Sequence, residues 1–172
     1  IEYNFNGSKT KTVSVYEYGT TAATADCLRT VTVYKDEVLA AVAPVTLPAF
    51  TDSEKKSVTV YVGNVKGEEI SNYTENWKSS AVDTVTLYKY YLDASNMYVA
   101  ATTPLLPSDT YMTKSETRRL TQTGSLKQVT YYKNDVKGDE LADWSIEYNF
   151  NGSKTKTVSV YEYGTTAATA DC

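Results

Sequence analysis

Two pairs of adjacent carboxylates are the first residues of this chain that could do chemistry. Glu68-Glu69 and Asp139-Glu140 each follow a Val-Lys-Gly sequence. Such a pair could act in acid catalysis or hold Ca²⁺, but a calcium loop would need several oxygen ligands at close alternating spacing. Neighbouring residues of a strand face opposite ways, so the two acids of a pair should not converge on one substrate atom. The sequence therefore favours a solvated turn with a lysine nearby.

Nucleophiles and metal ligands are also scarce. The chain contains no His, which removes the commonest general base and the commonest metal ligand. Cys27 and Cys172 occupy equivalent places, and neither has a His partner for nucleophilic catalysis. They are candidates for a covalent link between repeats, or for small buried apolar side chains. We expect no enzymatic activity, no metal and no cofactor.

Composition points towards strands and away from several partners. Sixteen Tyr stand against three Phe and two Trp, and Tyr suits half-exposed strands because its ring packs while its hydroxyl meets water. The net charge is −4 with both signs interspersed, so we expect no nucleic-acid partner. The chain has no run of eighteen apolar residues, so we expect no membrane span.

The elements that must position these residues are repeated. Residues 1–27 and 146–172 are identical, with an offset of 145 residues. We therefore interpret 1–145 as one full period and 146–172 as the start of the next, because repeats at a fixed spacing indicate an array.

Each period is predicted to contain two diverged halves. Residues 58–74 read VTVYVGNVKGEEISNYT and residues 129–145 read VTYYKNDVKGDELADWS. One half spans 58–128. The other spans 129–145 and continues into the equivalent of 1–57.

Alternation of apolar and polar residues predicts strands throughout. A pentapeptide such as Val-Thr-Val-Tyr-Lys recurs, with one mostly aliphatic face and one Thr/Tyr face. Two proline-containing connectors, 43–48 and 102–107, echo one another and hold all four prolines. The expected strands are 1–6, 9–18, 28–35, 38–42, 57–62, 68–78, 82–91, 97–101, 111–122, 126–133 and 139–149. The predicted fold is all-β: antiparallel hairpins stacked in tandem into an elongated β-strip or fibre.

The two Lys-Gly-acid-Glu blocks, at 66–69 and 137–140, and the Tyr-Asn-Phe-Asn-Gly block at 148–152 carry a resemblance. The chain resembles the tyrosine-rich YD/RHS-type tandem repeats, and more narrowly the long repeat arrays of very large bacterial surface proteins. The resemblance implies a β-strip building block at the cell surface rather than a chemistry.

These observations lead to a structural role as the expected function. The chain would be a repeat unit of an extracellular bacterial filament or cell-surface stalk, with itself as partner through β-strand contacts between successive repeats. The expected inter-repeat contacts are Val13, Val15, Tyr16, Val158, Val160 and Tyr161.

Other readings stay open. In an adhesin or carbohydrate-binding array, Tyr73, Trp77 and Trp144 would contact surface glycans, whereas cross-strand packing is the simpler role of exposed Tyr rows. The chain could also be a shell segment of an RHS-type protein, or the product of an engineered duplication.

Overall fold

A single antiparallel sheet makes up the fold, in a computed structural model that describes residues 2–3, 10–35 and 49–164. No helix occurs among these residues, and so none that could cross a membrane. The strands are β1 (Glu2–Tyr3), β2 (Thr10–Tyr18), β3 (Leu28–Lys35), β4 (Lys55–Val62), β5 (Ile70–Lys78), β6 (Ala81–Tyr90), β7 (Val99–Ala100), β8 (Met112–Arg119), β9 (Leu126–Lys133), β10 (Leu141–Tyr148) and β11 (Thr155–Val160).

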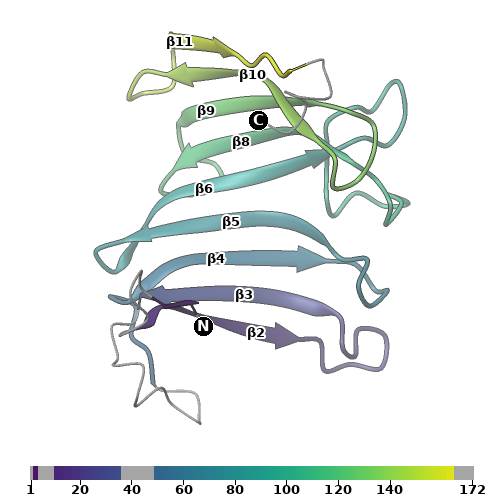
Figure 1. The fold of residues 1–172 in the computed structure, drawn as a ribbon, viewed down its shortest axis with the longest axis vertical. Helices are drawn as coiled ribbons and strands as arrows, with labels where there is room; N and C mark the ends of the chain where they lie inside the picture. Colours follow the sequence, from purple (N-terminus) through teal and green to yellow (C-terminus); the bar gives the residue numbers. More distant parts are fainter. Residues whose placement is uncertain (1, 4–9, 36–48, 165–172) are drawn as a thin grey trace.

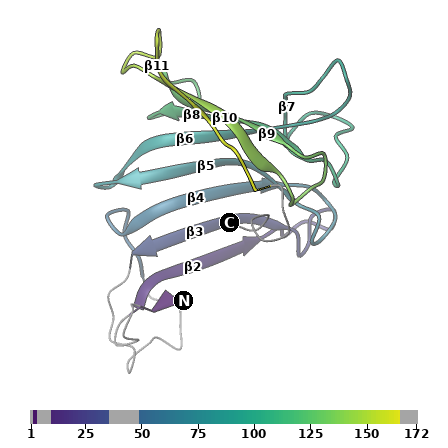
Figure 2. The same ribbon diagram turned by 45° about the horizontal axis from the view of Figure 1, so that its top comes forward.

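The strands pair in chain order, except that the short β7 lies beside β6 and β6 pairs onward with β8. Figures 1 and 2 show them side by side in one curved sheet, with β2 near one end and β11 at the other. The sheet does not close. The all-β prediction is confirmed. The fibre is not tested by a structure of one chain.

Alternation located most strands well. The expected ranges 28–35 and 126–133 coincide with β3 and β9. The expected strand 97–101 is reduced to the two residues of β7. The expected strands 68–78 and 139–149 begin later, because the acids that follow each glycine belong to the turn. The expected strand 38–42 and the connector 43–48 lie outside the described residues.

The pairing pattern repeats every four strands. The β4–β5 ladder pairs Val60 with Tyr73 and shifts register at Val60/Tyr61. The β9–β10 ladder makes the equivalent pair, Tyr131 with Trp144, with its shift at the corresponding place. The same match of register and shift holds for β5–β6 against β10–β11, for β2–β3 against β6–β8, and for β3–β4 against β8–β9. The two halves therefore differ in sequence but have the same strand pairing and the same register shifts.

One face of the sheet carries a network of hydroxyl groups, and we call it the hydroxyl face. Cross-strand hydroxyl contacts recur along it: Thr59 with Thr74 at 2.9 Å, Thr74 with Tyr88 at 3.0 Å, Thr86 with Thr117 at 3.0 Å, Ser115 with Tyr132 at 3.2 Å and Ser145 with Tyr161 at 3.2 Å. The opposite, aliphatic face carries Val13, Val15, Val58, Val60, Val85, Leu87 and Val129, as strand alternation and the pairing require.

Strand β3 departs from the pentapeptide pattern of its neighbours. Val31 pairs with Tyr16 on one side and Thr59 on the other, so its valines lie on the hydroxyl face. Because side chains alternate along a strand, register decides which face each residue takes. The pentapeptide alone does not.

A small core suffices for this sheet. Only Val85 and Cys27 are fully buried large side chains in the described part. A cluster of Ile70, Tyr90 and Ala101 packs where the chain between β6 and β8 folds back over the sheet. Most of the stability must therefore come from the ladders and from cross-strand pairs.

Candidate functional site

The second acid of each predicted pair accepts backbone hydrogen bonds both from its own turn and from the start of another strand. Glu69 accepts hydrogen bonds from the N–H of Gly67 at 2.9 Å and of Leu28 at 2.8 Å. Glu140 accepts from the N–H of Gly138 at 2.8 Å and of Met112 at 2.9 Å. Leu28 and Met112 are the first residues of β3 and β8. Glu69 directly precedes β5 and Glu140 directly precedes β10, so each hydrogen bond reaches two strands along the sheet. The two glutamates lie in exposed turns, as expected, and in addition accept a hydrogen bond from the backbone of a second strand.

Electrostatics at Glu69 agree with this role. Partial desolvation raises the pKa of its carboxyl, but the N–H groups of its own residue, Leu28 and Gly67, together with the positive charge of Arg29, outweigh that effect and lower it. The charged form is thus the one that the turn stabilises.

The lysines of the two blocks act differently from each other. Lys137 Nζ donates to the carbonyl oxygens of Ser108 at 2.7 Å and Glu68 at 3.3 Å, and the Ser108 hydroxyl donates to Glu68 Oε2 at 2.6 Å. Lys66 lies 3.6 Å from the carboxylate of Asp26. Lys137 therefore joins the turns of the two halves, while Lys66 makes an exposed ion pair.

No group of three or more His, Cys, Asp or Glu that could hold a metal occurs in the part of the chain that the structure describes. Glu68 and Glu69 contact different groups, which agrees with the expectation that such a pair would not converge.

The predicted inter-repeat residues lie on the two copies of one hairpin. Val13 is 5 % exposed, Val15 is half-buried and Tyr16 is exposed. In the second copy Val158 is 59 % and Val160 72 % exposed, and Tyr161 is also exposed. The copies share their register: Glu2 pairs with Thr12 as Glu147 pairs with Thr157. The structure does not bring the two sets together, because β2 and β11 lie far apart along the sheet (Figure 1).

Cys27 is a free thiol only 2 % exposed. It precedes β3, and its backbone N–H and C=O bond to Thr24 and Gly19. The thiol packs as a small apolar side chain here, and Cys172 lies outside the described residues.

The predicted ligand-binding aromatics are separated. Tyr73 and Trp77 lie on β5, and Trp144 lies on β10. Lys55 Nζ sits 4.4 Å from the centre of the Trp77 ring, and the buried indole N–H of Trp77 has no acceptor among the described residues. Burial, followed by the charge of Glu75, raises the pKa of Tyr73. Along the ladder, β6, β8 and β9 separate Trp144 from the other two side chains.

Trp144 instead belongs to a concave site that sequence reasoning missed, which we call the aromatic groove. It encloses about 350 Å³ and is lined chiefly by Tyr91, Tyr98, Tyr111, Tyr131, Trp144, Asp135 and Asp143. The available signal was the clustering of tyrosines around residues 91–111, a stretch that has no counterpart of equal length between β2 and β3.

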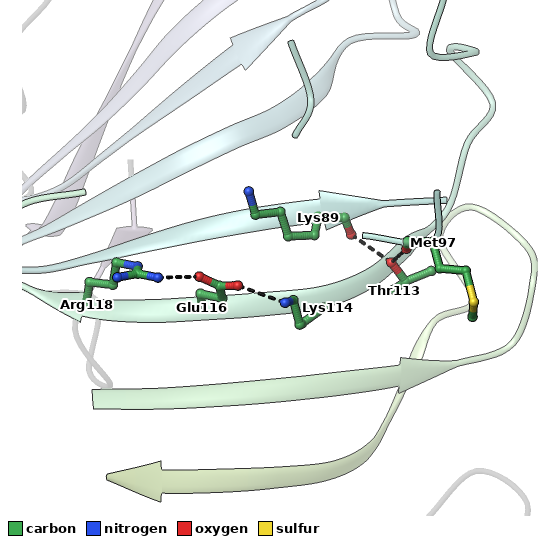
Figure 3. A network of polar contacts seen from close by, with 6 residues as sticks. All are labelled: Lys89, Met97, Thr113, Lys114, Glu116 and Arg118. Carbon is green, nitrogen blue, oxygen red and sulfur yellow. Dashed lines mark hydrogen bonds and ion pairs between the residues drawn. The ribbon is translucent and has the colours of Figure 1, made fainter. Parts of the chain in front are cut away.

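Polar contacts of Thr113 and Glu116 lie next to the groove, and Figure 3 shows these contacts. The buried hydroxyl of Thr113 donates to the carbonyl oxygens of Lys89 and Met97, which ties the chain around Met97 to β6 and β8. On the aliphatic face of β8, Glu116 pairs with Lys114 and Arg118, each at 2.8 Å. Desolvation raises the pKa of Glu116, but these two partners lower it overall. Lys114 Nζ in turn lies 5.0 Å from the ring centre of Tyr98.

Comparison of the chain with protein-family models, curated proteins and solved structures gave no match.

Proposed function

We propose that this chain is a structural repeat unit of an extracellular filament or cell-surface stalk, in which successive periods continue one sheet. The observation that carries the proposal is the different surroundings of two identical hairpins. β2 pairs with β1 on one side and with β3 on the other, whereas β11, which repeats the sequence and register of β2, pairs among the described residues only with β10. Val13 is buried in the first hairpin, and the equivalent Val158 is exposed in the second.

Strand direction is compatible with continuation. Eight pairings lead from β2 to β11 along the ladder. Because the number is even and every pairing is antiparallel, β11 runs in the same direction as β2. A strand with the sequence of β3 would therefore meet β11 in the orientation that β3 has against β2.

An unpaired edge strand offers its backbone groups to any partner, and proteins normally cover or blunt such edges. In an array each edge is covered by the next repeat, and a non-closing contact between identical units produces an open chain of units. The proposed role is mechanical continuity through backbone ladders. It assigns the chain no reaction and no cofactor, and its extracellular location rests on the resemblance to surface-protein repeats.

The test compares chains of one, two and three periods by small-angle X-ray scattering and negative-stain microscopy. A strand spacing of about 4.8 Å predicts that each added period lengthens the particle by about 40 Å at constant width. Particles that grow equally in all directions, or that close on themselves, would rule the proposal out.

A further inference from the structure

The aromatic groove is lined from both halves of the period: Tyr91, Tyr98 and Tyr111 lie in residues 58–128, and its other main residues lie in 129–145. Four of its residues replace different side chains at the equivalent positions of the other half: Tyr131 for Val60, Trp144 for Tyr73, Asp135 for Asn64 and Asp143 for Asn72. The framework would tolerate either set, since the registers are the same. These four replacements therefore give the groove its rings and carboxylates on a framework of unchanged strand pairing.

Two aromatic walls form the groove. In one group the rings of Tyr131 and Trp144 stack at 4.1 Å and 10°, and Tyr98 meets Tyr131 edge-on at 5.9 Å and 81°. In the other group Tyr91 and Tyr111 stack at 5.0 Å and 13°. Paired rings restrict one another, so the walls are largely pre-formed, as ligand sites usually are.

Hydrogen-bonding groups stand beside these rings. Asp135 and Asp143 both line the groove. Asp135 lines the groove together with Tyr111, and partial burial and then the charge of Asp135 raise the pKa of Tyr111. The site thus combines ring faces for apolar contact with carboxylates and phenols that can fix orientation.

The charges around the groove favour a neutral ligand. Lys133 Nζ is 3.5 Å from Asp143, and Lys114 Nζ lies over Tyr98, so ammonium groups of the chain itself already occupy the places that a cation would take. An anion would meet the two carboxylates and be repelled. A pyranose ring has C–H groups that pack on aromatic faces and hydroxyls that donate to carboxylates.

We propose that the aromatic groove binds a neutral saccharide, one to each period, through its Tyr and Trp rings with Asp135 and Asp143 as acceptors. The site goes beyond the mechanical role proposed above and does not depend on it, because all of its residues lie within one chain. In an array it would present a sugar-binding site at regular intervals.

The test uses the full chain with Trp77→Phe, which leaves Trp144 as the only indole. Its fluorescence is titrated with maltotriose, cellotriose and chitotriose, with trigalacturonic acid as the acidic probe and choline as the cationic one. We expect saturable binding of at least one neutral trisaccharide and none of the acidic probe. Absence of binding by all three neutral sugars, or binding of choline alone, would overturn the proposal.

Two variants localise the binding. Tyr98→Ala removes an exposed ring from the groove and should weaken binding about tenfold, while Tyr73→Ala, the equivalent of Trp144 in the other half, should change it less than about twofold. Circular dichroism checks that both variants fold. Equal binding by the Tyr98 variant and its parent would show that the sugar lies elsewhere, and would contradict the assignment.

Discussion

Glu69 and Glu140 show how one side chain can fix the geometry of a turn. Each carboxylate bonds to a glycine N–H of its own turn and to the first N–H of a strand two places away. Gly67 and Gly138 both have positive φ, 85° and 92°, a conformation that costs glycine little and other residues more. The glycine and the glutamate of the block are therefore both explained by the turn.

Replacing Glu69 by Ala should lower the free energy of unfolding by about 1–3 kcal/mol, because the partly buried N–H of Leu28 loses its acceptor. Glu68→Ala is the matched control and should change stability by about 0.5 kcal/mol or less, since its side chain is exposed. Urea unfolding followed by circular dichroism measures both. Equal losses for the two variants would contradict the assigned role.

The pH dependence of stability should report on Glu69 as well. Its pKa in the folded chain is lower than the ordinary value of 4.5, so its contribution is complete above that value and is lost as the pH falls through the folded pKa. Unfolding free energies measured between neutral and acid pH should therefore fall less steeply for Glu69→Gln than for the parent. Parallel curves would count against a lowered pKa.

Because Cys27 is buried, we expect its thiol to react slowly with reagents in solution. In a Cys172→Ser background, a disulfide reagent such as DTNB should label Cys27 only when the chain opens, so the rate should rise steeply with urea. Reducing agent should leave the unfolding midpoint unchanged. Immediate labelling in native buffer would show that the thiol is accessible and available for a link between units.

At the scale of elements, the duplicated hairpin places the same sequence in two environments. Val13→Asp with Val15→Asp puts charges where Val13 is buried, and we expect a loss of at least about 3 kcal/mol. Val158→Asp with Val160→Asp changes the identical residues where both are exposed, and should cost about 0.5 kcal/mol or less in a single chain. The same unfolding assay compares the two pairs, and similar losses would contradict the difference in burial.

Alternation and turn residues could predict the strands because each depends on neighbours in sequence. Ser79 and Ser80, both at positive φ, make the short turn between β5 and β6, and the sequence there signalled only a break between two strands. The face taken by β3 could not be predicted, because it depends on the register across two ladders. The aromatic groove was missed for a similar reason, since Tyr98 and Trp144 are far apart in sequence.

At the scale of the whole molecule, the open sheet buries few apolar side chains. Strands contact chiefly their ladder neighbours, so stability should pass from strand to strand as it does in repeat proteins. A terminal strand with one neighbour should open more easily than a central strand with two. We therefore expect the end strand β11 to open more often than the central strands β6 and β8.

Hydrogen exchange tests this expectation together with the continuation of the sheet. In the chain of 172 residues, amides of β11 should exchange faster than those of β6 and β8, because within the described ranges β11 pairs only with β10. In a chain extended to two full periods, the same residues 155–160 should exchange at least about tenfold more slowly, since a strand with the sequence of β3 can now pair with them. The valines at 158 and 160 should become covered in the same step, as Val13 is beside β3. If β11 exchanges at the same rate in both chains, the following strand does not add to this edge, and successive periods do not share one sheet.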